Sequence, residues 1–274
     1  MMADRSASKT HGWSRWFFQP PEGSAQALPG AVRTLNFLAA LGLIALVLAW
    51  PFTRLEGHWN WAAVYAYRQK FLDGYKLTIL ISLAALVLST LLGLVSALAG
   101  QSRLLPLRYV NRIYVDLVRG TPLLVQILIL YYVTANAVGV EDRNVAGVII
   151  LSLSYGAYLS EVIRAGIESV GKSQLDSAKA IGLTTAQTYR YVIFPQALRQ
   201  IMPSLAGQLV SLIKDSSLLS IISVSEFTKN AQETGNYTFS IFECYLPLAA
   251  GYLILTLPIS LLTRYLERRN RFET

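Results

Sequence analysis

The sequence contains little that could bind a metal ion or cross-link the chain. Its 274 residues include one cysteine and two histidines. Cys244 has no second thiol with which to form a disulfide, and one cysteine alone does not build a thiolate metal site. His11 and His58 lie far apart in polar stretches. These shortages argue against a disulfide-stabilised secreted scaffold and against a zinc enzyme.

Charged residues are also scarce. They make up 15% of the chain, whereas hydrophobic residues make up 53%, and a soluble domain carries about 25% charged residues. There are too few charges to cover a water-exposed surface. Intrinsic disorder is excluded as well, because it requires low hydrophobicity and high net charge. The composition therefore indicates an integral membrane protein.

The few charges are spaced so that long uncharged runs lie between them. Most of these runs approach the roughly 20 residues that a helix needs to cross the hydrocarbon core. Residues 201–225 form a further apolar run that is interrupted only by Lys214 and Asp215. Lipid cannot satisfy open backbone groups, and the runs are too long and too uniformly apolar for barrel strands. The sequence therefore predicts an all-α integral membrane protein with six transmembrane helices, at 33–53, 77–100, 117–138, 144–163, 203–226 and 244–264.

The position of the basic residues predicts the orientation. With the N-terminus inside, the inner segments hold 17 Lys and Arg and the outer segments hold six. Inner loops of membrane proteins carry such an excess, so the net charge of +8 is explained without nucleic acid. Residues 1–32 are then a cytoplasmic tail, 33–53 a retained anchor helix rather than a cleaved signal peptide, and 265–274 a second cytoplasmic tail.

Two spans carry small residues at every fourth position. Such rows let helix backbones approach closely, which favours a packed bundle over helices isolated in lipid. The rows are Ser89, Gly93 and Ala97 in the second span, and Ser152, Gly156 and Ser160 in the fourth.

The longest inner connection, residues 161–200, has the pattern of a rigid bracket. Residues 174–181 are expected to form a short helix, which Gly182 ends. A second helix is expected over 184–193, with Thr184 or Thr185 as its N-cap and with Pro195 ending it. A helix–glycine–helix bracket at the membrane surface is suited to transmitting force to another protein.

The residues of this bracket resemble a known family. Asp176 to Leu183, followed by Ile193 to Ala197, is similar to the EAA loop of permease subunits of type I ABC importers. The sequence departs from that pattern at Asp176 (for Glu), Ser177 (for Ala) and Phe194 (for Leu), each time keeping the chemical character. Further matches point to the polar amino-acid branch, which is the histidine, glutamine and arginine type. These are Arg119 to Gln126, Glu161 with Arg164 to Ile167, and Lys214 to Leu218.

The resemblance implies a five-helix permease domain over 74–264, with a coupling loop at about 168–200 and an extra N-terminal helix before it. It also implies a bacterial plasma (inner) membrane location with both termini cytoplasmic. The expected partners are ATP-binding cassette ATPase subunits, a second permease subunit (identical or homologous), an extracytoplasmic amino-acid-binding protein and membrane lipid. The resemblance implies that the ATPase docks on Asp176, Ser177, Ala178, Gly182, Leu183 and Pro195.

No cofactor and no catalysis are expected in this chain. We expect no phosphate-binding loop here, so ATP and magnesium are expected to bind in the partner ATPase. The alternatives are an ion-coupled secondary carrier, which typically shows an internal repeat, and a non-transport membrane enzyme or scaffold. An enzyme would need converging His, Asp and Glu residues that the sequence does not offer.

Lys214 and Asp215 are the first candidates for the substrate pathway. A charge in the middle of a span costs about 2.5–3.5 kcal/mol on insertion scales. Neighbouring residues on a helix point about 100° apart and do not neutralise each other. Three interpretations stay open: an ion pair with another helix or subunit, contact with the carboxylate and ammonium of an amino acid, or a locally unwound helix.

Three further residues are weaker pathway candidates. Glu161 either pairs with Arg164 or faces the pathway as a gate, Tyr158 is expected to line a cavity, and Glu226 is expected at the outer mouth. The hydroxyls of Tyr131, Tyr132 and Tyr155 are possible cavity groups of the same kind, and Asp116 is expected to pair with Arg119.

Overall fold

The computed structural model describes residues 30–50, 53 and 59–270, and every regular element in these ranges is a helix. The described residues fall into two compact units. The first contains α2 (Gly30–Ala49), a 20-residue apolar helix that corresponds to the first predicted span. The second begins at Trp59 and contains all the other helices.

The second unit is built around two long helices, α4 (Arg68–Gly100) and α7 (Arg143–Glu168). The short helix α3 (Trp61–Ala66) leads into α4. The remaining elements are α5 (Leu105–Gly120), α6 (Leu123–Ile129), the π-helical turn η2 (Leu130–Ala135), α8 (Lys172–Ala180), α9 (Thr185–Thr188), the π-helical turn η3 (Tyr189–Ile193), α10 (Phe194–Asp215), the 3-10 helix η4 (Ser216–Ile222), α11 (Phe227–Thr238) and α12 (Ile241–Asn270).

The two rows of small residues face each other between α4 and α7. A Cβ added to Gly93 would lie 2.8 Å from the Cβ of Leu159, and one added to Gly156 would lie 3.1 Å from the Cβ of Leu92. Ser89 and Ser152 are fully buried in this contact. Residue numbers rise together along both helices, so α4 and α7 run parallel. The sequence predicted each row as a packing face, and the structure shows that each row is packed against the other helix.

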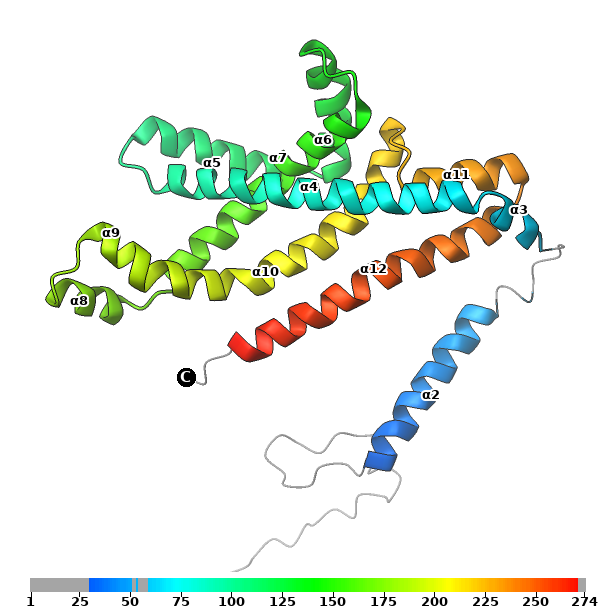
Figure 1. The fold of residues 1–274 in the computed structure, drawn as a ribbon, viewed down its shortest axis with the longest axis horizontal. Helices are drawn as coiled ribbons and strands as arrows, with labels where there is room; N and C mark the ends of the chain where they lie inside the picture. Colours follow the sequence, from blue (N-terminus) through cyan, green and yellow to red (C-terminus); the bar gives the residue numbers. More distant parts are fainter. Residues whose placement is uncertain (1–29, 51–52, 54–58, 271–274) are drawn as a thin grey trace, which may run out of the picture. The chain divides into compact units, whose positions relative to one another are not determined.

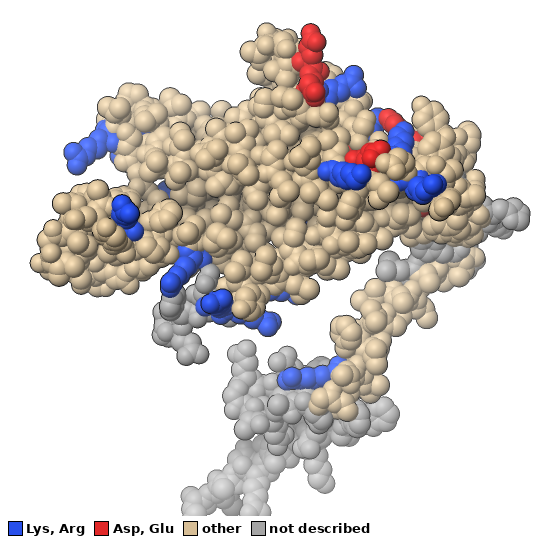
Figure 2. All heavy atoms as spheres, in the orientation of Figure 1, with Lys and Arg blue, Asp and Glu red and all other residues tan. Residues whose placement is uncertain are grey.

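Apolar side chains cover both the interior and much of the outside. The central cluster joins α4, α6, α7, α10 and η4 through buried residues such as Ile81, Ile127, Leu151 and Leu212. On α4, the opposite face exposes leucine and valine side chains, among them Leu80, Val87 and Val95. On the face drawn in Figure 2, charged side chains gather toward the two ends of the unit, and the surface between them is mostly uncharged. This distribution suits a protein that is surrounded by lipid.

The third predicted span, 117–138, is not one helix. The chain breaks after Gly120, and the helix pair α5 and α6–η2 bends by 113°, so that α6 projects away from α4 and α5 (Figure 1). Thr121 is extended (φ −117°, ψ 144°) because the following Pro122 disfavours the helical conformation at that position. The prediction overlooked this proline. We call residues 120–122 the elbow.

The fifth predicted span, 203–226, has different bounds. The α-helix α10 starts earlier, at Phe194, and ends at Asp215, where the chain tightens into the 3-10 helix η4. Ser223, with φ 62°, ends η4 in the left-handed region. The chain then forms α11, which the sequence analysis assigned to an outer loop. α11 packs on the first part of α4, where a Cβ added to Gly74 would lie 2.7 Å from Nδ2 of Asn230 and 2.9 Å from Cα of Phe227.

The first part of the bracket of residues 161–200, up to the start of its second helix, folds as predicted. α8 covers the first predicted helix, and Gly182 adopts φ +77°, which favours glycine. Thr184 is the N-cap of α9 and forms a capping box with Gln187. The prediction that Pro195 ends this helix is wrong, because the chain continues through η3 into α10. Pro195 lies in the first turn of α10, where its missing N–H is tolerated. In a continuous α-helix its ring would clash with the carbonyl group four residues earlier, and the π-helical turn η3 changes the hydrogen-bond pattern at that point.

Within the described residues, five helical segments are long and apolar enough to cross a membrane, and six if the bent pair is counted as one span. The predicted all-α membrane architecture is confirmed.

The α4–α7 contact provides a test of the fold. Gly93→Ala is expected to destabilise the chain by roughly 1–3 kcal/mol, because the added methyl overlaps Leu159 and the backbone of Ser160 in a packed interface. The measurement is the thermal unfolding midpoint of the purified chain in detergent. Gly207→Ala is the matched control, since a methyl at that helical glycine meets no atom of this chain within 4 Å. Equal midpoints for the two variants would contradict the packing argument.

Candidate functional site

A cavity of about 270 Å³ lies where α6, α7 and α10 meet. Most of the side chains that line it carry a polar group, and one of them is charged: Asp215, which stands at the last position of α10. The residues that line the cavity are Leu123, Gln126, Ser154, Tyr155, Tyr158, Gln208, Ser211 and Asp215. A small polar cavity with a single carboxylate, set among apolar helices, is the arrangement expected of a site for a small polar solute.

Asp215 is held in place by one strong hydrogen bond. The hydroxyl of Tyr155 donates to Oδ2 of Asp215 at 2.6 Å. Tyr155 is itself buried, and its ring lies 6.2 Å from the ring of Tyr158. No other described residue donates to this carboxylate or pairs with it, so Oδ1 is available to accept from a bound cationic group such as an ammonium.

The rest of the cavity lining contains neutral donors and acceptors. Ser154 donates to Oε1 of Gln126 at 2.6 Å. Ser211 and Gln208 lie one and two turns before Asp215 on the same side of α10. The Gln208 amide and the Ser211 hydroxyl can donate to a carboxylate, so the cavity offers partners for both charged ends of a zwitterion.

Lys214 does not line this cavity. Its side chain is exposed and makes no ion pair with any residue that the structure describes. The sequence analysis left open an ion pair with another helix, and none forms within the described part of this chain. The α-helix ends at Asp215, so the pair also stands at a change of helix type. The two neighbouring charges therefore point to different surroundings, as their 100° separation predicts.

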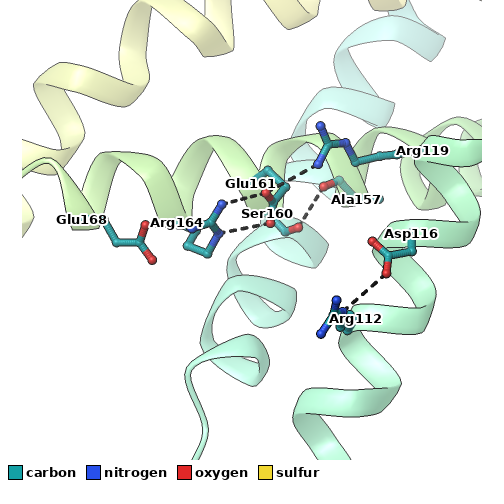
Figure 3. Close-up of polar contacts among 8 residues, drawn as sticks. All are labelled: Arg112, Asp116, Arg119, Ala157, Ser160, Glu161, Arg164 and Glu168. Atoms are coloured by element: carbon teal, nitrogen blue, oxygen red, sulfur yellow. Dashed lines mark hydrogen bonds and ion pairs between the residues drawn. The ribbon is translucent and has the colours of Figure 1, made fainter.

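Glu161 belongs to a separate network of ion pairs between α5 and α7 (Figure 3). Its Oε2 lies 2.8 Å from Arg164 and 3.5 Å from Arg119, and Arg164 also contacts Glu168 at 2.7 Å. The i+3 pairing with Arg164 is the one that the sequence indicated. The expected pair of Asp116 with Arg119 is wrong, because Asp116 contacts Arg112 instead, at 3.6 Å.

The network borders a second, more strongly charged cavity of about 450 Å³. Four arginines line it, namely Arg108, Arg112, Arg119 and Arg164, against two acidic residues, Asp116 and Glu161. Its excess of positive charge would repel an ammonium group. The cavity at Asp215 is therefore the better candidate for a zwitterionic solute, although it is the smaller one.

Glu226 is not placed at an open mouth. Its side chain is fully buried and caps α11, accepting from the backbone N–H groups of Thr228 and Lys229. It also accepts from the hydroxyls of Tyr252 at 3.0 Å and Thr78 at 3.4 Å. Glu226 thus joins α4, α11 and α12, and its role in this chain is structural.

Five of the six residues expected to dock a partner lie on α8 and the turn after it, and Pro195 lies in the first turn of α10. Ala178 is buried and its carbonyl accepts from the N–H of Leu183, which closes the turn around Gly182. Ile181, at the tip of this turn, is 76% exposed. A shallow hollow of about 320 Å³ beside it is lined by Ser177, Ala178, Ile181 and Leu183 among others. Asp176 pairs loosely with Lys179 at 3.8 Å, and Pro195 begins α10.

The sequence contains one match to the phosphate-binding motif, although the sequence analysis expected none. Gly166 to Ser173 has the letters of that motif, G-x-x-x-x-G-K-S. The motif binds phosphate only as a loop between a strand and a helix. Here Gly166 lies inside α7, packed so closely that an added Cβ would be 2.5 Å from Ile201. No strand occurs in residues 59–270. The match therefore does not indicate a phosphate-binding loop.

Residues 89–272 match the profile of one family, described as the inner membrane component of binding-protein-dependent transport systems. The chain belongs to this family. The predicted transport permease is confirmed, and nothing observed favours an ion-coupled carrier, a membrane enzyme or a scaffold.

Several curated relatives of this permease are similar over most of their length. The L-cystine transport system permease protein TcyB of Bacillus subtilis is 41% identical, with 72% of this chain and 84% of the relative covered. The probable glutamine ABC transporter permease protein GlnM of the same organism is 34% identical, covering 73% and 92%. The glutamine transport system permease protein GlnP of Escherichia coli is 33% identical, covering 77% and 97%.

Solved structures give the same fold. A crystal structure of an amino acid ABC transporter with histidines contains a chain that is 34% identical, with a TM-score of 0.72, covering 78% of this permease and all of that chain. The MetNI methionine ABC transporter in an inward-facing conformation has a TM-score of 0.62 at 14% identity, covering 76% and 99%. This second likeness concerns the fold alone.

Gln208 and Ser211 were missed by the sequence analysis. Together with the predicted Asp215 they recur at i, i+3 and i+7, which is a polar stripe along the second half of α10. That stripe was a readable signal. Gln126 and Ser154 had no such signal, since only the bend at the elbow brings them together.

Asp215 provides a direct test of the cavity. Asp215→Asn removes the negative charge but keeps the size, so it is expected to raise the KM for solute uptake by roughly 10- to 100-fold, the value of a hydrogen bond to a charged group. Uptake is measured with radiolabelled amino acids as probes, at matched amounts of membrane-inserted permease. Lys214→Met is the matched control, and its KM should stay near the wild-type value. If Lys214→Met raised the KM as much as Asp215→Asn, the cavity would be misassigned.

Proposed function

We propose that this chain is the permease subunit of an ATP-driven importer for polar amino acids. The observation that carries the proposal is the cavity with a single carboxylate, Asp215, at the meeting point of three membrane helices. Asp215 complements an ammonium, and the Gln208 amide and the Ser211 hydroxyl can donate to a carboxylate. The relatives named for glutamine and L-cystine support the same class of substrate.

The transport pathway is proposed to form between two permease subunits, identical or homologous. Lys214 supports this, because an exposed ammonium in a membrane span without an ion-pair partner in the described chain needs water or a second subunit beside it. Asp215 is proposed to contact the ammonium of the substrate, with Tyr158 beside it in the same cavity. Glu161 is proposed to act on the elbow rather than on the substrate.

The energy is proposed to come from ATPase subunits that dock on the coupling loop. Ala178, Gly182 and Leu183 form a closed turn whose apolar tip, Ile181, is exposed. Asp176, Ser177 and Pro195 flank this turn. ATP and magnesium are proposed to bind in the partner, and this chain is proposed to need no cofactor of its own. Closure of the ATPase subunits would then move α8 as a rigid body together with α7 and α10.

Solute is proposed to arrive from an extracytoplasmic binding protein, since the family is defined by dependence on one. The proposed location is the bacterial inner membrane with both termini in the cytoplasm. The distribution of basic residues supports this orientation.

Reconstitution tests the proposal as a whole. The permease is placed in proteoliposomes with its ATPase and binding protein, and uptake of labelled L-glutamine and L-cystine is measured with and without ATP. Uptake of one of them that requires ATP and both partners is the expected result. The control contains the permease alone under a proton or sodium gradient, and uptake there would overturn the proposal in favour of an ion-coupled carrier.

Gly182 tests the coupling loop. Gly182→Asp places a side chain at φ +77°, a strain of roughly 1–2 kcal/mol, which is expected to distort the turn that holds Ile181. Transport should fall severalfold or more, while insertion of the chain and ATP hydrolysis by the assembled complex persist. The readout is the number of solute molecules transported per ATP hydrolysed.

Gly139→Asp is the matched control for this variant. Gly139 has a similar φ of +74° and open space around it, but it lies in the turn before α7, outside the coupling loop. A normal transport ratio in Gly182→Asp would refute the coupling role, and equal losses in both variants would assign the effect to strain alone.

A further inference from the structure

The bend at the elbow between α5 and α6 is stabilised by the side chain of Gln126. Nε2 of Gln126 donates to the backbone oxygen of Val118 at 2.7 Å, to that of Thr121 at 2.9 Å, and to the Thr121 hydroxyl oxygen at 3.0 Å. The break at Pro122 leaves carbonyl groups at the end of α5 without helical partners. The Gln126 amide supplies those partners from the first turns of α6, so it closes the elbow across the bend.

The other end of the same amide fixes the elbow to α7. Oε1 of Gln126 accepts from the Ser154 hydroxyl at 2.6 Å. Ser154 is 1% exposed, so this hydrogen bond is shielded from water. All polar atoms of the Gln126 amide are therefore engaged, and the amide has no group left over for binding solute strongly.

A second attachment lies two turns further along α7. Arg119, the residue directly before the elbow, contacts Glu161 at 3.5 Å (Figure 3). Residues 154 and 161 are seven apart and so lie on the same side of the helix. This second link is half-exposed and longer, hence weaker than the buried hydrogen bond. Two contacts therefore attach the elbow to α7: the buried hydrogen bond between Gln126 and Ser154, which is the stronger one, and the ion pair between Arg119 and Glu161.

The hydrogen bond between Gln126 and Ser154 is part of the cavity wall. Leu123 and Gln126 form the α6 side of the cavity, and Ser154 and Tyr155 are consecutive residues of α7. Tyr155 in turn holds Asp215. The chain of contacts runs from the elbow through Gln126 and Ser154 to the residue that orients the carboxylate. The width of the cavity therefore depends on the contact between Gln126 and Ser154.

We propose that Gln126 is a positioning residue for the transported amino acid, which sets the shape of the Asp215 cavity by fixing the elbow to α7. The inference rests on the proposed function and deepens it. The Gln126 amide itself does not carry the substrate. Its loss allows α6 to move away from Tyr155 and Asp215, so that solute is bound less tightly while the assembled transporter still turns over.

Gln126→Glu tests the role with almost no change of size. A carboxylate cannot donate to Val118 and Thr121, and it places negative charge against their oxygens. The expected result is a KM for ATP-driven uptake raised roughly tenfold or more, with the maximal rate per assembled complex within about threefold of wild type. The probes are labelled L-glutamine and L-cystine in proteoliposomes that contain the ATPase and the binding protein. Gln101→Glu, the same chemical change at an exposed turn after α4, is the matched control and should leave both values unchanged.

Ser154→Ala keeps the hydrogen bonds of Gln126 to Val118 and Thr121 and removes only the stronger of the two links from the elbow to α7. It is expected to raise the KM less than Gln126→Glu, by roughly threefold to tenfold, with normal assembly. If Gln126→Glu fails to assemble, the KM of Ser154→Ala tests the inference in its place. A wild-type KM in Ser154→Ala, or a lower maximal rate at unchanged KM in an assembled Gln126→Glu complex, would overturn the inference.

A distance measurement separates this inference from the proposed function. Spin labels at Val110 on α5 and Val133 on η2, two exposed positions, report the elbow angle in the assembled complex when labelled chains are diluted with unlabelled ones. A broader distance distribution in Gln126→Glu than in Gln101→Glu is expected. If wild type transports neither probe, the proposed function fails, and an unchanged distribution would then refute the role of Gln126 independently.

Discussion

The fold depends on the close approach of two backbones, those of α4 and α7. Glycine and serine rows on both helices remove the side-chain volume that would hold them apart, so the helices run parallel in contact over several turns. In lipid there is little hydrophobic force between helices, and such contacts rely on van der Waals packing. This pair fixes where α7 presents Ser154, Tyr155 and Tyr158, and therefore where the cavity lies.

Two interruptions of the membrane helices place polar groups beside the cavity. The elbow at 120–122 frees carbonyl groups that Gln126 satisfies, and the change from α10 to η4 brings Asp215 to the end of an α-helix. A continuous helix satisfies its own backbone and offers little to a solute. Interruptions cost backbone hydrogen bonds, but they supply the polar surface that a transport site requires. The cavity lies between two such interruptions.

The charged groups divide into three separate roles. Asp215 faces the cavity, Glu161 connects α7 with the residue before the elbow, and Glu226 caps α11 within a buried contact of three helices. All three are carboxylates within predicted spans, so the sequence alone does not distinguish their roles. Different partners distinguish them: a tyrosine and open space for Asp215, two arginines for Glu161, and backbone N–H groups for Glu226.

The sequence by itself determined the membrane class, most of the spans, the two packing rows, and the first helix and glycine turn of the bracket, because these follow from local composition and from motifs that are contiguous in the chain. It also contained Pro122, which predicts the elbow, although the span pattern obscured it. Only the tertiary structure decided that Gln126 meets Ser154, that Tyr155 orients Asp215, and that Lys214 points elsewhere. These contacts join residues 28 and 60 positions apart. They depend on the angle at which helices cross, and hydrophobic periodicity does not encode that angle.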